Sequence, residues 1–150
     1  AAKAVCFKEA LTTEYQEYAK QILNNAKALA DSFQEQGLRV VSGGTENHLV
    51  LVDTRSVDEE LTGKEAGILL NEKGITLNRN AIPFDPRSPF ITSGIRMGTP
   101  AVTTCGMQED ELTQVGYLIS EILKNRLDDN KLNELEEQVR SLAKSFQPYG

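Results

Sequence analysis

Apolar positions in the first quarter of the chain repeat with helical spacing. From Tyr15 to Phe33 they recur at intervals of three and four residues, which is the stripe of an amphipathic helix. Gly37 follows the last apolar turn and is predicted to end this helix. The pattern is interrupted at Thr12-Thr13, which predicts a break between a shorter first helix and the long one.

The next part of the chain alternates between strand and helix signals. Short runs of β-branched and apolar residues predict strands over three ranges: 38–41, 47–53 and 74–78. A capping box, T-x-x-E from Thr62 to Glu65, predicts a helix over 62–73. Gly74 is predicted to end it.

Proline and glycine mark the segment that follows. Three prolines within 79–90 predict an ordered loop, because proline has no N–H group and a fixed φ. Strand character returns over 91–104, interrupted by Gly94, Gly98 and Pro100.

Two helices are predicted to close the chain. The first covers 107–125, with acids in its first turn and a base in its last, as the helix dipole favours. The second is predicted to be capped by Asn130 and to be followed by Pro148. This order of elements predicts an α+β fold, a small, mostly antiparallel sheet with helices packed on one face. No second domain boundary is visible, so we expect residues 1–150 to form one domain.

Composition and charge exclude several classes of function. Of the 150 residues, 39% are hydrophobic and 25% charged, which is near the globular average and excludes global disorder. The net charge of −6 is unsuited to binding nucleic-acid phosphates or an anionic membrane surface. No apolar run approaches the roughly 18 residues that cross a bilayer. We therefore expect no nucleic-acid partner and no membrane partner.

Metal-ligating side chains are scarce. Cys6, Cys105 and the single histidine, His48, are fewer than the roughly four ligands of a zinc site, so no metal is expected. Two distant cysteines favour free thiols in a reducing cytoplasm.

Positive charge gathers in the loop-rich centre of the chain. Between Lys73 and Met107 there are four basic residues and one acid, Asp85. The segment 108–150 holds nine acids and five bases. A guanidinium group binds a carboxylate through two parallel hydrogen bonds, so this region could hold a small anion. Solvated loop charges are the alternative.

Arg96 is the candidate anion ligand in this region. It stands in a strand pattern between Gly94 and Gly98, where glycines let a ligand or another backbone come close. An arginine in this position is either paired internally or directed at a bound carboxylate.

Three separated segments resemble one enzyme family. GGTENHLVLVD (43–53), GITLNRNAIPFDPRSPF (74–90) and TSGIRMGTPAVTT (92–104) are together similar to the C-terminal part of bacterial serine hydroxymethyltransferase. The opening AAKAVCFKEAL resembles the helix that leads from the large domain of that enzyme into its small one. The resemblance implies the C-terminal small domain of a pyridoxal-phosphate enzyme of the aspartate-aminotransferase fold type, with residues 1–36 as the helical lead-in.

The resemblance also implies roles for individual residues. The family interconverts serine and glycine and moves a one-carbon unit to or from tetrahydrofolate. Arg96 matches the arginine that holds the α-carboxylate of the amino-acid substrate. Ser88, Pro89 and Phe90 match the loop that lines the folate site, and Asn80 matches an asparagine close to the pterin. The family is usually a cytoplasmic homodimer.

Other parts of the family's active site have no match. The family's pyridoxal phosphate is bound to a lysine in a Thr-rich THK motif, and none of the nine lysines lies in such a context. We therefore expect the cofactor to be held by a large domain that precedes Ala1, no catalytic residue in this chain, and no activity of the chain alone. Two positions depart from the family pattern: Arg79 replaces a usual lysine and Cys105 a usual arginine. The alternative is an independent α+β module that binds a small carboxylate or has a regulatory role.

Overall fold

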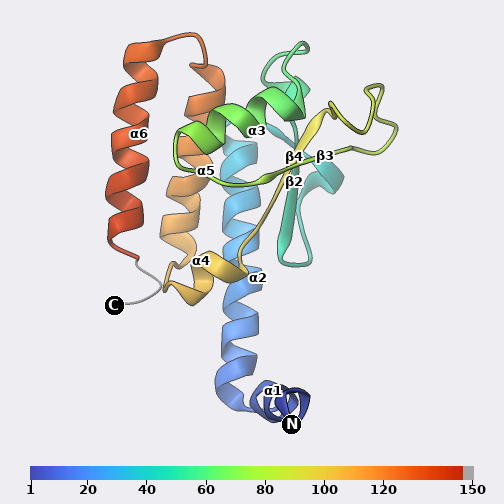
Figure 1. The fold of residues 1–150 in the computed structure, drawn as a ribbon, viewed down its shortest axis with the longest axis vertical. Helices are drawn as coiled ribbons and strands as arrows, with labels where there is room; N and C mark the ends of the chain where they lie inside the picture. The colour runs from blue at the N-terminus through green and yellow to red at the C-terminus, as the bar shows by residue number, and fades with distance from the viewer. Residues whose placement is uncertain (147–150) are drawn as a thin grey trace.

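The computed structural model describes residues 1–146, which form helices and one small sheet (Figure 1). In chain order the elements are α1 (Ala2–Ala10), α2 (Thr13–Glu35), β1 (Arg39–Val40), a 3-10 turn (Val41–Gly43), β2 (Leu49–Asp53), a second 3-10 turn (Thr54–Ser56), α3 (Gly63–Glu72), β3 (Asn78–Asn80), β4 (Gly94–Gly98), α4 (Pro100–Thr104), α5 (Glu109–Lys124) and α6 (Asp129–Lys144).

Helix boundaries follow the capping signals of the sequence. The break at Thr12 is confirmed, because its hydroxyl accepts a hydrogen bond of 3.3 Å from the N–H of Tyr15 and begins α2. The capping box of α3 is confirmed as well: Thr62 accepts from the N–H of Glu65 at 3.1 Å, and the Glu65 carboxylate accepts from the N–H of Thr62 at 3.1 Å. Gly37 and Gly74 follow α2 and α3 with φ of +80° and +86°, as predicted.

The four strands form one antiparallel sheet in the order β1-β2-β4-β3. In the central pair, Val52 lies opposite Ile95 and Val50 opposite Met97. Leu51 lies opposite Arg96, between these two pairs. Because side chains alternate along a strand, Leu51 and Arg96 both point to the opposite face of the sheet. The register therefore places Val50, Val52 and Ile95 on one face, and Arg96 on the other face together with Leu49 and Leu51.

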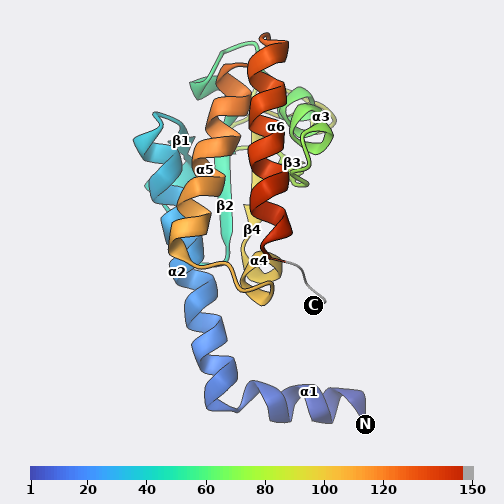
Figure 2. The same cartoon turned by 90° about the vertical axis from the view of Figure 1, so that its left-hand side faces the viewer.

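Helices cover the apolar face of the sheet. Val50, Val52 and Ile95 are fully buried in one core with residues of α2, α3, α5 and α6, among them Phe33 and Leu70. Figure 2 shows α5 and α6 in front of the sheet, with α2 on one side and α3 on the other. The predicted α+β fold, with a small antiparallel sheet and helices on one face, is confirmed. The opposite face, which carries Arg96, we call the open face.

α1 stands apart from this core. It has no buried residue and extends away from the foot of α2 (Figures 1 and 2). Its apolar side chains Val5 and Phe7 are 57% and 66% exposed. No described helix is both long and apolar enough to cross a membrane.

Two of the predicted strands, over 74–78 and 38–41, are displaced or shortened. The strand predicted over 74–78 is wrong in position, since β3 begins at Asn78 and includes Arg79 and Asn80, which were expected in the loop. Leu77 and Ile75 instead pack at the edge of the core, which apolar residues do with or without strand pairing. β1 is limited to Arg39–Val40, because the chain turns at Val41.

One further strand prediction and one helix prediction are corrected. The strand character predicted over 91–104 is wrong beyond Gly98, where Pro100 occupies the first position of α4, a site at which proline's missing N–H costs nothing. Asn130 is not the cap of α6: the Asp128 carboxylate accepts from the N–H of Lys131 at 3.0 Å, so the helix begins earlier. The predicted Pro148 after this helix lies outside the described residues.

Candidate functional site

Arg96 lies in the middle of the open face. It is the central residue of β4, opposite Leu51 of β2 and Asn78 of β3. Its side chain is half-buried and makes no hydrogen bond or ion pair with any residue in 1–146. A guanidinium held in this way on a rigid strand keeps its five N–H donors available for an anion.

A polar groove of about 740 Å³ adjoins Arg96. Its walls come from the C-terminal half of α2, the turn 42–47, and Leu49 and Leu51 on β2. Lys27 adds a second positive charge and Asp31 a negative one. The groove therefore offers a small polar molecule one apolar wall and one guanidinium, a combination suited to a compound that carries a carboxylate.

Asn80 lies on the same face of the sheet as Arg96, on the neighbouring strand. Asn78 pairs with Arg96 and Asn80 with Gly94, so the two asparagines share the face of Arg96. The side-chain amide of Asn80 donates to the carbonyl oxygen of Ala81 at 2.6 Å. A Cβ at position 94 would lie 2.8 Å from the Asn80 carbonyl oxygen and 3.2 Å from Leu51 Cδ1, so Gly94 allows these elements to approach.

Ser88, Pro89 and Phe90 lie on the loop between β3 and β4, and all three are exposed. Phe90 is 77% exposed. The carbonyl oxygen of Ser88 accepts from the N–H groups of Ile91 and Thr92 at 3.0 and 2.9 Å, which orders this turn. The structure brings Asn80 and Arg96 together on one face, whereas none of Ser88, Pro89 and Phe90 lines the groove beside Arg96.

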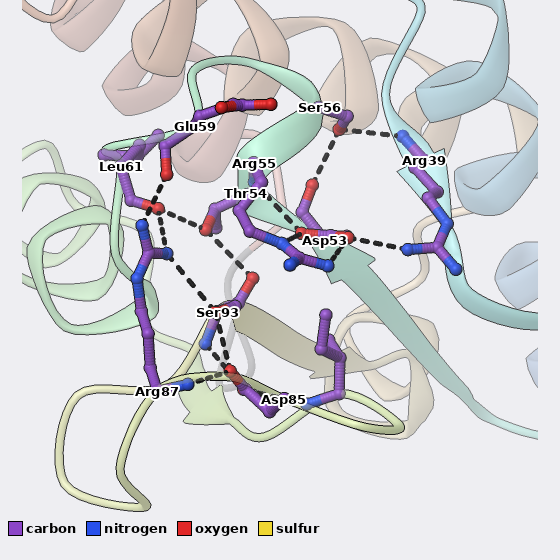
Figure 3. A network of polar contacts seen from close by, with 11 residues as sticks. Arg39, Asp53, Thr54, Arg55, Ser56, Glu59, Leu61, Asp85, Arg87 and Ser93 are labelled. Atoms are coloured by element: carbon purple, nitrogen blue, oxygen red, sulfur yellow. Dashed lines mark hydrogen bonds and ion pairs between the residues drawn. The ribbon is translucent and has the colours of Figure 1, made fainter.

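Asp85 fixes the base of this loop, as Figure 3 shows. Its Oδ1 accepts hydrogen bonds from the Arg87 N–H at 3.0 Å and the Ser93 hydroxyl at 2.7 Å. Its Oδ2 accepts from the N–H groups of Ile82 at 3.2 Å and Ser93 at 2.8 Å. We call these four residues, Ile82, Asp85, Arg87 and Ser93, the Asp85 clasp. It joins the two ends of the loop through one carboxylate.

Further contacts join the Asp85 clasp to the rest of the sheet. The Arg87 guanidinium donates to the carbonyl oxygens of Leu61 at 2.9 Å and of Glu59 (Figure 3). The Ser93 carbonyl oxygen accepts from the N–H of Thr54 at 2.9 Å and from its hydroxyl at 3.0 Å. The loop is thereby tied to the segment that follows β2.

A buried carboxylate, Asp53, lies at the end of β2. It accepts from Arg39 Nη1 and Arg55 Nη2, both at 2.8 Å. Burial raises the pKa of Asp53, but the hydrogen bonds from Arg55 and Arg39 outweigh burial, so the net pKa is lowered. These arginines are occupied by Asp53, in contrast to Arg96.

The acidity of Asp85 predicts how stability depends on pH. Burial by itself raises its pKa, but hydrogen bonds from the Ser93 hydroxyl and from the N–H groups of Arg87, Ser93 and Ile82 lower it from 3.8 to about 2. A lowered folded-state pKa gives stability that is complete above about pH 5 and is lost as pH falls toward 2, here up to about 2 kcal/mol. We expect the difference in free energy of unfolding between the protein and its Asp85→Asn variant to shrink by that amount from about pH 6 to 2.5 in urea titrations. A difference that does not change with pH would contradict this assignment.

Sequence reasoning did not find the Asp85 clasp. A signal was present, because Asp85 is the single acid between Lys73 and Met107. Sequence reasoning also gave no role to Gly63. Its N–H donates to the Thr92 carbonyl oxygen at 3.0 Å, and its missing side chain lets α3 approach β4.

The lysines of this chain are either exposed or paired with an acid. A lysine that binds pyridoxal phosphate is typically a sheltered amine. Here seven of the nine lysines are exposed. The two half-buried ones, Lys73 and Lys131, are paired with Glu136 and Glu134 at 2.9 and 3.2 Å. Among residues 1–146 there is also no group of three His, Cys, Asp or Glu side chains placed to hold a metal ion.

Comparison with known proteins places the chain among serine hydroxymethyltransferases. The family model described as serine hydroxymethyltransferase matches residues 1–119. A serine hydroxymethyltransferase of Myxococcus xanthus is 53% identical over 149 residues, which is 99% of this chain and 35% of the relative. One of Idiomarina loihiensis is 48% identical over 150 residues, all of this chain and 35% of the relative.

The chain thus spans about a third of the length of the curated relatives that it matches. The family match covers the whole sheet, including β4 with Arg96, the loop with Asp85, α1 to α4 and the part of α5 up to residue 119. Because that match extends over well more than half of the residues, the chain belongs to the serine hydroxymethyltransferase family.

Proposed function

We propose that this chain forms the substrate-carboxylate and folate-facing part of an enzyme that interconverts serine and glycine with tetrahydrofolate as the one-carbon carrier. Arg96 binds the α-carboxylate of the amino acid. Ser88, Pro89 and Phe90 face the folate, and Asn80 lies near its pterin. The observation that carries this proposal is the half-buried Arg96 guanidinium, which no described acid pairs with, at the centre of the open face.

Physical reasons favour Arg96 in this role over a solvated charge. Its strand is hydrogen-bonded on both sides, by β2 and by β3, so the base of the side chain has little freedom to move. A planar guanidinium on such a strand fixes both oxygens of a carboxylate and hence the orientation of the whole amino acid. Orientation of this kind contributes several kcal/mol to catalysis.

The cofactor and the remaining chemistry lie outside this chain in our proposal. Pyridoxal phosphate is held by a large domain, residues 1–36 are the lead-in from it, and residues 1–150 contribute no catalytic side chain. The exposed apolar residues of α1 and of its C-cap support this division, since Val5, Phe7 and Leu11 are left without cover by the described residues. We also propose that the whole enzyme is a cytoplasmic homodimer.

The test compares glycine production by the 150-residue chain with that of the protein encoded by the full reading frame that contains it. The full-length protein, supplied with pyridoxal phosphate, serine and tetrahydrofolate, is expected to produce glycine. The 150-residue chain is expected to produce none and to leave the absorption spectrum of pyridoxal phosphate with glycine unchanged. Glycine production by the chain alone would refute the division of labour. A reading frame that begins near Ala1 and binds a carboxylate without turnover would favour the independent module instead.

A further inference from the structure

We propose that Asp85 is a positioning residue, which holds the loop between β3 and β4 in the conformation that presents Ser88, Pro89 and Phe90 to the folate co-substrate. This inference rests on the proposed function, because it assumes that the loop faces folate. It adds Asp85 to the residues of the proposed function. Asp85 is not expected to contact either substrate and acts through the backbone of the loop.

Both oxygens of the Asp85 carboxylate are fully engaged as hydrogen-bond acceptors. Each carboxylate oxygen accepts two hydrogen bonds, of 2.7 and 3.0 Å at Oδ1 and of 2.8 and 3.2 Å at Oδ2. Three of the four donors are backbone N–H groups, which belong to Ile82, Arg87 and Ser93. Because these donors come from both ends of the loop, the carboxylate closes it across the turn that carries Ser88 to Phe90.

The loop needs such a constraint because its backbone is strained. Phe84 and Thr92 have φ of +57° and +61°, in the left-handed region that non-glycine residues rarely adopt. Apolar burial supports the loop at Ile82, which is buried, but not at Phe84 or Phe90, which are both exposed. Polar contacts therefore impose its shape, and those of Asp85 are the most numerous.

Arg87 provides a convenient probe of the loop conformation. Its guanidinium donates to the carbonyl oxygens of Leu61 and Glu59 and to the Ser93 hydroxyl, so the side chain is turned back onto the protein. Trypsin cleaves after an arginine only when its own pocket can take up that side chain. The Arg87–Ser88 bond should therefore resist trypsin while the Asp85 clasp is intact.

Asp85→Asn is the informative substitution. An amide has nearly the shape of a carboxylate but replaces one acceptor oxygen with an NH₂ donor. In either orientation the NH₂ meets at least one backbone N–H donor, because both oxygens of Asp85 accept from backbone. Glu59→Gln is the matched control: it removes one carboxylate charge nearby, while Glu59 contributes only its carbonyl oxygen to Arg87.

Both variants are to be made in the full-length enzyme that contains this chain. In Asp85→Asn we expect cleavage after Arg87, located by mass spectrometry, to accelerate about tenfold, since disruption of buried hydrogen bonds to a charged group shifts the opening equilibrium by at least that factor. The KM for tetrahydrofolate is expected to rise about tenfold, with the KM for serine changed less than about twofold. Glu59→Gln is expected to leave all three quantities within about twofold of the parent.

The possible results separate this inference from the proposed function. Unchanged cleavage after Arg87 would overturn the role of Asp85 and leave the folate assignment of the loop intact. Faster cleavage with an unchanged KM for tetrahydrofolate would overturn the inference and also count against the folate assignment. If Asp85→Asn folds poorly, Ser93→Ala removes one of the four bonds to Asp85, and it also removes the bond from Arg87 to the Ser93 hydroxyl. The KM values therefore decide for this variant. The KM for tetrahydrofolate is expected to rise by a smaller factor than in Asp85→Asn with the KM for serine unchanged, and an unchanged KM for tetrahydrofolate would overturn the inference.

Discussion

Replacing Arg96 with alanine in the full-length enzyme is expected to lower kcat/KM for serine about 10²- to 10³-fold, chiefly through a higher KM. Truncation of one partner of a bidentate charge pair costs about 3 to 4 kcal/mol, and 1.4 kcal/mol corresponds to tenfold. Arg96→Lys keeps the charge but loses the planar fork, so its loss is expected to be intermediate. Steady-state kinetics with serine varied at saturating tetrahydrofolate measures both variants.

Arg79→Ala is the matched control for this prediction. Arg79 lies one strand away on β3, opposite Ile95, and so faces the other side of the sheet. Its removal is expected to change the KM for serine less than about twofold. An Arg96→Ala enzyme with an unchanged KM for serine would show that the guanidinium does not bind the substrate carboxylate.

The second large effect is expected at Gly63, where α3 meets the start of β4. A Cβ at this position would overlap the carbonyl oxygen of Gly94 and the Thr92 hydroxyl. The backbone cannot retreat freely, because the N–H groups of Gly63 and Lys64 donate to the carbonyl oxygens of Thr92 and Ile91, both at 3.0 Å. Gly63→Ala is therefore expected to lower the free energy of unfolding by about 2 to 3 kcal/mol and the Tm by about 5 to 10 °C.

Gly67→Ala provides the control within the same helix. The nearest atom to its added Cβ is Leu77 Cδ1 at 4.0 Å, so the methyl group fits. Alanine favours the helix over glycine, and a gain of about 0.5 to 1 kcal/mol is expected. Thermal unfolding followed by circular dichroism compares the two variants. Equal melting temperatures would contradict the steric argument for Gly63.

Local signals predicted most of the helices correctly. The Thr12 break, the Thr62 capping box and the stop at Gly37 were all confirmed, because a cap depends on side chains and backbone groups within four residues of each other. The final cap was misplaced at Asn130 because Asp128 offers the same chemistry two residues earlier. The sequence could not rank these two candidates, since Asp and Asn are nearly equal as N-cap residues.

Strand boundaries were predicted less well, and the candidate site was predicted in part. The strand expected over 74–78 shifted to Asn78–Asn80, because only those residues lie opposite β4. Arg96 and Asn80 were named from motifs and share one face of the sheet. The Asp85 clasp was not predicted, because its donors depend on how the loop folds back on itself, and Arg87 reaches carbonyl groups 26 and 28 residues away.

By itself the sequence determined the kinds of elements, their caps and the family resemblance, since each of these depends on neighbours along the chain or on motif order. The tertiary structure alone decided that Arg96 lies on the face opposite Val50, Val52 and Ile95, that Asp53 pairs with both Arg39 and Arg55, and that Asp85 closes the loop. The physical reason is the same in each case. Strand register and ion pairing are long-range choices, and a one-residue slip in β4 would turn Arg96 into the core and Ile95 out to the open face.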